Sequence, residues 1–257
     1  MIDIHSHILF GIDDGSKSFE ESMNIIKKAV DANVTDIILT PHYMLGSDYV
    51  TNNVEKRKII SKLKREVKKQ ELPINLYLGN EVFVENDMDS LKNNGEITTL
   101  NNSKYLLFEL PLNYVYNGIG DVLFELRCKG YIPVVAHPER YTFLKENPSL
   151  ITELIDKGAL FQSNIGSFLG TYGRHAKETA ILFLKHHVIT FMGSDIHHDT
   201  HDFYDRINEC KDIMRKYVSE EEIDDLFNNN ANKILNKEEI SVAEYIPFKK
   251  SLFGKWK

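Results

Sequence analysis

The chain has 257 residues, of which 42% are hydrophobic and 27% charged, the composition of a globular protein that buries a core. A net charge of −7 argues against a nucleic-acid partner held by bulk electrostatics, and no apolar run is long enough to insert into a membrane. The two cysteines, Cys128 and Cys210, lie far apart and lack the paired spacing of a zinc site. These features predict a protein of the reducing cytoplasm.

Short apolar runs alternate with amphipathic helical patterns along the whole chain. Several runs are continuously apolar, as in parallel strands that are covered on both faces. The predicted strands are 1–5, 35–42, 74–81, 104–110, 131–140, 159–164 and 188–198. The predicted helices are 18–33, where Ser18 and Glu21 indicate a capping box, then 51–70, 120–130, 149–158 and 173–187, with further helices from about Asp202.

Seven successive strand–helix units with no linker between them predict a single parallel barrel of the (β/α) type. An open, doubly wound sheet is the alternative. No glycine-rich loop typical of nucleotide binding follows any predicted strand, which weakens the nucleotide-binding form of that alternative.

The first predicted strand, in the sequence MIDIHSH, carries two histidines. Side chains alternate along a strand, so His5 and His7 project from one face, opposite Ile2 and Ile4. The alternation differs from the uninterrupted run of a purification tag. We expect no cleaved leader, because cleavage would remove these histidines. The H-x-H pattern alone is a weak indicator of a metal site, and a half-buried strand with a polar face is the simpler interpretation.

Six of the seven predicted strands end in histidine, aspartate or glutamate. Each such residue alone has a structural explanation, such as a helix cap or a surface ion pair. In a parallel barrel, however, all the strand ends meet at one face, where so many charges would repel one another unless cations held them. We therefore predict a metal site built from His5, His7, Asp14, His42, Glu81, Glu109, His137, Asp195 and His197, while the sixth strand ends at Gln162 and Asn164.

The predicted ligands are imidazoles and carboxylates without any thiolate, a set that suits manganese, iron or zinc. A catalytic ion takes about three protein ligands, so nine candidates indicate two or three divalent ions. Glu81 and Glu109 are carboxylates able to bridge two of these ions.

Several motifs together resemble one known family: MIDIHSHILFGIDDGSKSFEESM, NSKYLLFELP, GYIPVVAHPERY and GSDIHH. They are similar to the PHP (polymerase and histidinol phosphatase) family, and within it to the capsule-type, manganese-dependent protein-tyrosine phosphatases of Gram-positive bacteria. The resemblance implies one domain over 1–257 with a distorted (β/α)7 TIM-like barrel. The resemblance reaches roughly residue 235, so we expect a core with C-terminal helices over about 1–235, and the basic residues that follow predict a tail over about 236–257.

The resemblance implies dephosphorylation of phosphotyrosine on a protein, expected to be the autophosphorylated tail of a tyrosine kinase that controls capsule synthesis. A small-molecule phosphatase of the same family, such as histidinol-phosphate phosphatase, would share every ligand and is the alternative. Amide hydrolysis on a similar barrel is disfavoured because no lysine stands at a strand end to be carboxylated. A non-enzymatic member of the family would be expected to lack ligands, and none is missing.

The resemblance also implies roles for individual residues. Arg140 would meet the phosphate, and His42 or His197 could donate a proton. Related sequences often carry a second arginine shortly after the SD-x-H element; here only His201 or Arg206 can replace it. The three implied ion sites are His5, His7, Glu81 and Asp195; then Glu81, Glu109 and His137; then Asp14, His42 and His197.

The expected mechanism is attack on phosphorus by a hydroxide that bridges metal ions, because bound cations lower the pKa of water to near 7. Arg140 would neutralise charge on the phosphoryl oxygens. The cysteine-based mechanism requires an arginine six residues after the cysteine. Val134 and Lys216 occupy those positions after Cys128 and Cys210, so the sequence excludes it.

Overall fold

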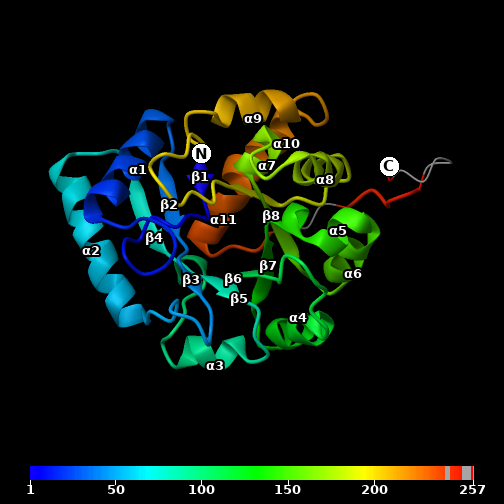
Figure 1. Cartoon of the computed structure of the whole chain (residues 1–257), viewed down its shortest axis with the longest axis horizontal. Helices are drawn as coiled ribbons and strands as arrows, with labels where there is room; N and C mark the ends of the chain where they lie inside the picture. Colours follow the sequence, from blue (N-terminus) through cyan, green and yellow to red (C-terminus); the bar gives the residue numbers. More distant parts are fainter. Residues whose placement is uncertain (241–243, 251–255, 257) are drawn as a thin grey trace.

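The structure is a computed structural model that describes residues 1–240, 244–250 and 256 (Figure 1). Every strand pair in this part of the chain is parallel. The strands are β1 (Ile2–Asp3), β2 (Asp36–Leu39), β3 (His42–Tyr43), β4 (Asn75–Leu78), β5 (Glu81–Phe83), β6 (Tyr105–Glu109), β7 (Ile132–Ala136), β8 (Leu160–Asn164) and β9 (Phe191–Gly193).

Helices surround the strands, and the longer ones match the predicted helices to within a few residues. The shorter helices α3, α5 and α7 were not predicted. The helices are α1 (Phe19–Asp31), α2 (Asn53–Lys69), α3 (Met88–Asn93), α4 (Ile119–Cys128), α5 (Thr142–Glu146), α6 (Ile151–Asp156), α7 (Ile165–Leu169), α8 (Arg174–Lys185), α9 (Ile207–Met214), α10 (Glu220–Asp224) and α11 (Asn230–Asn236). None of them, within the described residues, has the length and apolar character needed to cross a bilayer.

The N-terminus of α1 differs in one detail from the predicted capping box. Ser18 is the N-cap, and its hydroxyl accepts a hydrogen bond from the amide of Glu21. The carboxylate of Glu21, however, accepts from the amide of Lys17 and not from that of Ser18. The first half of the box is therefore present, and the reciprocal bond is shifted by one residue.

The strands form a curled, distorted barrel, as predicted. One sheet has the order β1-β2-β4 and the other the order β3-β5-β6-β7-β8-β9. A parallel bridge between Ser6 and Ile196 joins the end of β1 to the segment after β9, which brings the two outer strands of the assembly together. This contact favours the barrel over the open sheet.

The predicted strands 35–42 and 74–81 are each interrupted and become two strands, β2 with β3 and β4 with β5. Pro41 lies in the first interruption and has no amide hydrogen for a ladder bond. Asn80 lies in the second, and its side-chain amide donates to the carbonyl of Pro41. Both strands are therefore interrupted at neighbouring positions, just before His42 and Glu81. These two residues are direct partners in the pairing of β3 with β5.

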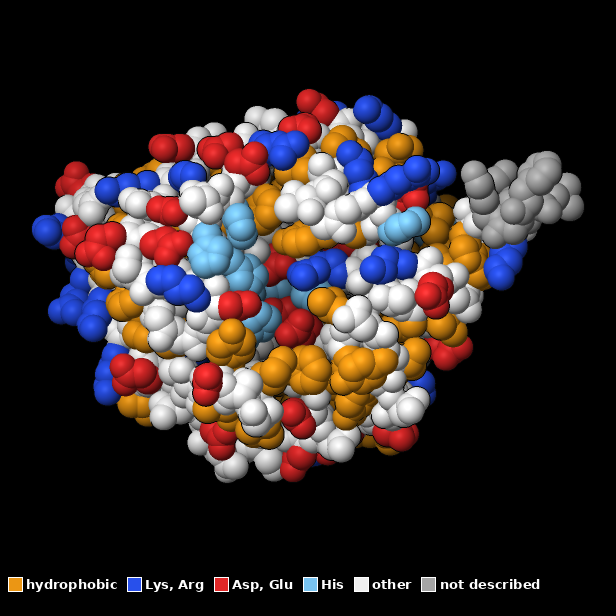
Figure 2. Space-filling model, viewed as in Figure 1, with side chains coloured by type: hydrophobic (Ala, Val, Ile, Leu, Met, Phe, Trp, Pro, Cys, Tyr) orange, Lys and Arg blue, Asp and Glu red, His pale blue; other side chains and the backbone are white. Residues whose placement is uncertain are grey.

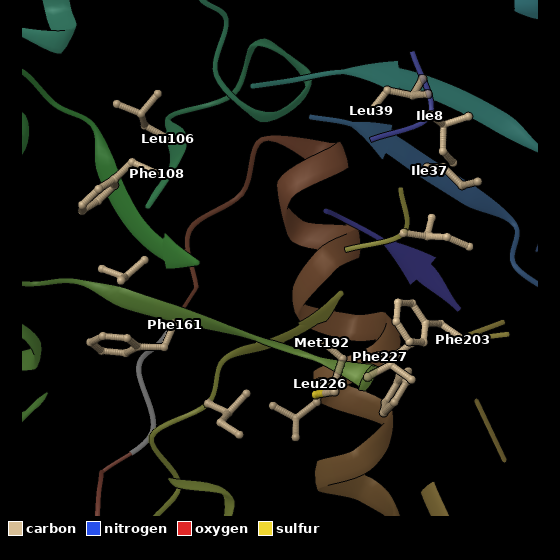
Figure 3. Packing of buried hydrophobic residues seen from close by; sticks show 14 of the residues in the cluster. Ile8, Ile37, Leu39, Leu106, Phe108, Phe161, Met192, Phe203, Leu226 and Phe227 are labelled. Atoms are coloured by element: carbon tan, nitrogen blue, oxygen red, sulfur yellow. The ribbon is translucent and has the colours of Figure 1, made fainter. Parts of the chain in front are cut away.

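Alternating side chains of the strands fill two hydrophobic clusters. Ile37, Leu106 and Phe108 belong to the larger cluster, which also contains helix residues such as Leu63 and Val122. Figure 3 shows these three strand residues among other buried side chains of this cluster. Ile38 and Leu107, the next residues along, belong to the inner cluster. Both faces of the strands are thus buried, which explains why their sequences read as continuous apolar runs.

Helix α11 closes the end of the barrel at which the strands begin. Its residues Ala231 and Ile234 belong to the inner cluster. Just beyond the helix, the carbonyl of Glu238 accepts a hydrogen bond from the hydroxyl of Tyr105, the first residue of β6. The opposite end, where the strands finish, is left open for a functional site.

The predicted basic tail lies partly outside the described residues, which omit 241–243, 251–255 and 257. In the described part, the amide of Ile246 donates to the carbonyl of His186. The ring of Phe248 stacks on the ring of His186 at 4.1 Å between centroids. This stretch therefore packs beside the end of α8, while the division into a core and a tail remains a prediction.

Candidate metal centre

The nine side chains that the sequence singles out as ligands lie together at the ends of the strands. Figure 2 shows histidine and acidic side chains around a hollow on this face of the molecule. The hollow is a pocket of about 270 Å³. Its lining residues are Asp14, His42, Met44, Tyr49, Glu81, Glu109, Leu112, His137, Arg140, Asp195 and His197.

The deepest group of possible ligands comes from three different strand ends and is buried. It consists of His5, His7, Glu81 and Asp195. The Nε2 atom of His5 lies 3.2 Å from Nε2 of His7, 3.1 Å from a Glu81 oxygen and 3.4 Å from an Asp195 oxygen. One cation is able to reach all four side chains, because their ligand atoms lie within 4.8 Å of one another.

His42 belongs to both remaining groups. Its Nδ1 atom lies 3.1 Å from Glu81 and 3.4 Å from Glu109, and its Nε2 atom lies 3.5 Å from Asp14. The two groups are therefore His42 with Glu81 and Glu109, and His42 with His7, Asp14 and His197.

The grouping around Glu109 differs from the expected one, in which His137 accompanied Glu81 and Glu109. His137 is nevertheless close, with Nε2 at 2.9 Å from one Glu81 oxygen and 3.8 Å from a Glu109 oxygen. Its assignment as a ligand stays a prediction.

Unpaired buried atoms test whether these residues suit metal ions. Nδ1 of His42, Oε2 of Glu81 and Nδ1 of His137 are buried and make no hydrogen bond within the described part of the chain. Leaving buried polar atoms without a partner is costly, and a cation would offset that cost for Oε2 of Glu81 and Nδ1 of His42, which face each other across 3.1 Å. The residues therefore fit divalent ions.

Charge in the pocket leads to the same conclusion. Burial, reinforced by the neighbouring carboxylates of Glu81 and Asp195, raises the pKa of Glu109 to about 9. Burial lowers the pKa of His5, but Glu81 and Asp195 outweigh it and raise that pKa to about 9. Without cations, the neighbouring carboxylates thus keep both the Glu109 carboxyl and the His5 imidazole protonated at pH 7. Metal ions would replace those protons, because only neutral imidazole and ionised carboxylate bind metal.

Two polar residues to which the sequence analysis gave no role, Asp13 and Gln162, hold predicted ligands in place. Asp13 lies 3.0 Å from Nδ1 of His7 and also accepts from the amide of His42. Gln162 lies 2.6 Å from Nδ1 of His5. Such partners on the second ring nitrogen orient a metal-binding histidine. In the sequence, these residues could be noticed only by their positions, Asp13 in the IDDG motif and Gln162 at the end of the sixth predicted strand. Nothing in the local sequence distinguishes Asp13 from Asp14.

The backbone is specialised where it approaches the ligands. His137 and Asp195 have positive φ angles of 33° and 52°, which are uncommon outside glycine and mark sharp turns at the ends of β7 and β9. A side chain at Gly15 would meet the carbonyl oxygen of His7 at 2.1 Å. Glycine therefore lets the segment with Asp13 and Asp14 fold back over the first strand.

Arg140 lies at the edge of the ligand cluster. Its Nη1 atom donates to Asp195 at 3.0 Å, and its guanidinium lies 4.5 Å from the centre of the Tyr172 ring. The preceding residue, Glu139, is buried and accepts hydrogen bonds from the amide of Asn164 and the hydroxyl of Ser167. These contacts anchor the loop, and Arg140 itself lines the pocket.

The two candidates for the second phosphate contact are placed differently. The guanidinium of Arg206 binds Glu209 at 2.8 and 2.9 Å and lies 3.6 Å from Asp202. His201 instead has its Nδ1 atom 3.5 Å from the amide of His197. The geometry therefore favours His201 over Arg206 as a neighbour of the pocket.

A parallel barrel that gathers imidazoles, carboxylates and one arginine at the ends of its strands has the arrangement of a metal-dependent hydrolase. Residues 1–236 match the family described as "Capsular polysaccharide synthesis, CpsB/CapC". The chain belongs to this CpsB/CapC family.

Several relatives are similar to this chain over most of their length. The putative tyrosine-protein phosphatase CapC of Staphylococcus aureus is 39% identical over 77% of both chains. Tyrosine-protein phosphatase YwqE of Bacillus subtilis is 32% identical over 99% of both. A solved structure from work on YwqE and on CpsB of Streptococcus pneumoniae, described as metal-dependent tyrosine phosphatases, superposes with a TM-score of 0.89 at 30% identity, covering 97% of this chain and all of that one.

A histidinol phosphate phosphatase from Lactococcus lactis shares the fold more distantly. Its TM-score is 0.56 at 17% identity, with 84% of this chain and 93% of that one covered. This similarity supports the predicted PHP-type barrel and carries no information about substrate.

Proposed function

We propose that this protein is a metal-dependent protein-tyrosine phosphatase. The observation that carries the proposal is the cluster of predicted ligands with Arg140 around a single pocket, in a chain whose relatives bear the name tyrosine-protein phosphatase. The small-molecule alternative, a histidinol-phosphate phosphatase, is supported only by a distant similarity of fold.

The cofactor in this proposal is two or three divalent ions, with Mn²⁺ preferred. The ligand side chains are His5, His7, Asp14, His42, Glu81, Glu109, His137, Asp195 and His197. When bound, the ions supply a water-derived nucleophile at neutral pH and offset the charge of the phosphoryl group. The mixture of carboxylates and imidazoles without thiolate suits manganese, iron and zinc alike, so the preference for manganese rests on the resemblance to manganese-dependent phosphatases.

Arg140 holds the phosphate in this mechanism. One guanidinium nitrogen stays on Asp195, and the remaining N–H groups bind phosphoryl oxygens as negative charge develops on them. Tyrosine leaves as a phenolate whose conjugate acid has a pKa of about 10, so the need for a strong general acid is modest.

A proton for the departing group would come from His42 or His197, whichever is not fully engaged by a metal ion. Both line the pocket and are only partly exposed. Burial and the neighbouring His7 lower the pKa of both histidines, that of His197 to about 4, so in the absence of metal His197 is neutral at pH 7 and suits metal binding better than proton donation. Which of the two histidines acts depends on how each is engaged by the ions.

The substrate in this proposal is a phosphotyrosine protein, with the autophosphorylated tail of a capsule-synthesis tyrosine kinase as the partner. Support comes from the description of the family, which concerns capsular polysaccharide synthesis. A cytoplasmic location belongs to the same proposal and is consistent with two unpaired cysteines.

The test compares a phosphotyrosine peptide, the matching phosphoserine peptide and histidinol phosphate as substrates of the Mn²⁺-loaded protein. We expect the highest kcat/KM for the phosphotyrosine peptide. Comparable values for the two peptides would remove tyrosine preference from the proposal, and a higher value for histidinol phosphate would favour the alternative.

A further inference from the structure

Exposed apolar side chains gather beside the metal pocket. Eight large hydrophobic side chains are well exposed in the described part of the chain, and five of them lie on two segments next to the pocket. Figure 2 shows hydrophobic side chains along one side of the hollow that holds the histidines and acids. We call these five the apolar rim: Leu45, Val50 and Val54 after β3, and Tyr114 and Val115 after β6.

The apolar rim continues into the wall of the pocket. Met44 and Tyr49 of the first segment and Leu112 of the second all line it. The Tyr49 ring lies nearly parallel to the His42 ring, at 15° and 5.9 Å between centroids. The pocket thus has a polar floor for a phosphate and an apolar wall between that floor and the rim.

Hydrogen bonds hold both segments in shape. In the first, the amide of Met44 donates to the carbonyl of Tyr49, and the amide of Tyr49 donates to the hydroxyl of Ser47. In the second, the carbonyl of Leu112 accepts from the amide of Thr142, two residues after Arg140. A preformed surface loses little conformational entropy when a ligand binds.

A cluster of exposed apolar side chains next to a polar pocket indicates a binding surface. A phosphorylated side chain in the pocket would place its neighbours in the peptide directly over the rim. Tyrosine is long enough to cross the apolar wall with its ring, whereas phosphoserine has no ring to contact it. The occupant that satisfies both regions is an extended peptide with apolar side chains beside phosphotyrosine.

We propose that the apolar rim is the docking surface for the substrate peptide and selects apolar side chains next to the phosphotyrosine. Met44, Tyr49 and Leu112 contact the ring of the phosphotyrosine itself. This inference rests on the proposed phosphatase function and adds to it the chemistry of the sequence that the enzyme prefers.

The experiment uses two phosphotyrosine peptides of equal length and charge, one with leucine and phenylalanine beside the phosphotyrosine and one with serine and glutamine. p-Nitrophenyl phosphate, which has no peptide flanks, is the third substrate. We expect the wild-type, Mn²⁺-loaded protein to prefer the apolar peptide by about tenfold in kcat/KM, mainly through KM, as one or two buried apolar groups provide.

The double variant Leu45→Ser/Tyr114→Ser should lose this preference and keep its activity on p-nitrophenyl phosphate. The matched control is Tyr217→Ser, because Tyr217 is also exposed but lies outside both segments. The control should keep the preference.

Equal kcat/KM for the two peptides in the wild type would overturn the docking proposal while leaving the phosphatase function intact. A double variant that is monomeric where the wild type self-associates, with unchanged peptide preference, would assign the rim to a second copy of the chain and also overturn it. Absence of activity on all three substrates would instead overturn the proposed function.

Discussion

Replacing Arg140 with lysine tests the proposed phosphate contact most directly. The guanidinium of Arg140 has two engagements, a 3.0 Å hydrogen bond to Asp195 and a position 4.5 Å from the centre of the Tyr172 ring. Lysine keeps the positive charge but presents one nitrogen, which cannot hold Asp195 and grip two phosphoryl oxygens in one plane. The substitution therefore removes the planar set of hydrogen-bond donors and keeps the positive charge.

The magnitude follows from the contacts that are lost. Removing one preorganised donor to a developing oxyanion costs about 2–4 kcal/mol, which corresponds to a decrease in kcat of roughly 30- to 900-fold. Loss of the guanidinium contact with the Tyr172 ring costs about another 0.5–1 kcal/mol, because the side chain is then held less firmly in place. Folding should be little affected, because the side chain of Arg140 is 24% exposed and its loop is anchored through Glu139.

The assay measures kcat on p-nitrophenyl phosphate together with metal content by elemental analysis. Arg206→Lys is the matched control, since Arg206 binds Glu209 on the surface, and its turnover should stay close to that of the wild type. Near wild-type turnover of Arg140→Lys with unchanged metal content would refute the reasoning and leave Arg140 a structural residue.

Three further predictions concern the metals and the fold. Chelation should abolish activity and Mn²⁺ should restore it best; activity that survives exhaustive chelation but is lost on thiol alkylation would contradict the metal mechanism. Glu81→Ala should cost more activity than His42→Ala. Both residues belong to two ligand groups, but Glu81 is a fully buried carboxylate with two ligand oxygens, whereas His42 is partly exposed; equal turnover and metal content would argue against this. Burial lowers the pKa of Lys56 to about 7. The unfolded chain then binds more protons between pH 7 and about 10, so stability should rise with pH there by up to about 1.4 kcal/mol per pH unit. Lys56→Met should reduce this slope in urea denaturation at pH 7, 8 and 9, and identical slopes would contradict the assignment.

The sequence by itself determined which side chains would stand at the ends of the strands. Residues such as His5, His7 and Asp195 follow apolar runs directly, and the order of a run and its polar end is a local property of the chain. The repetition of this pattern through the chain also determined the parallel barrel, since parallel strands bring their ends to one face.

Only the tertiary structure decided how the ligands group. His42 lies near Glu81 and Glu109 because β3 pairs with β5 in a register that sets His42 opposite Glu81. That register depends on the interruptions of both strands at Pro41 and Asn80, which a continuous apolar run does not reveal. The resemblance to known phosphatases had placed His137 in that group.

The supporting residues were also beyond the reach of the sequence. Asp13 and Asp14 are chemically alike and adjacent, yet Asp13 holds the His7 ring while Asp14 faces His42 and His197. The choice depends on how the segment folds back over the first strand at Gly15. The hydrogen-bond partners and the apolar rim both depend on which segments, far apart in the sequence, become neighbours in space. The closed barrel determines these neighbours, so the sequence alone does not reveal them.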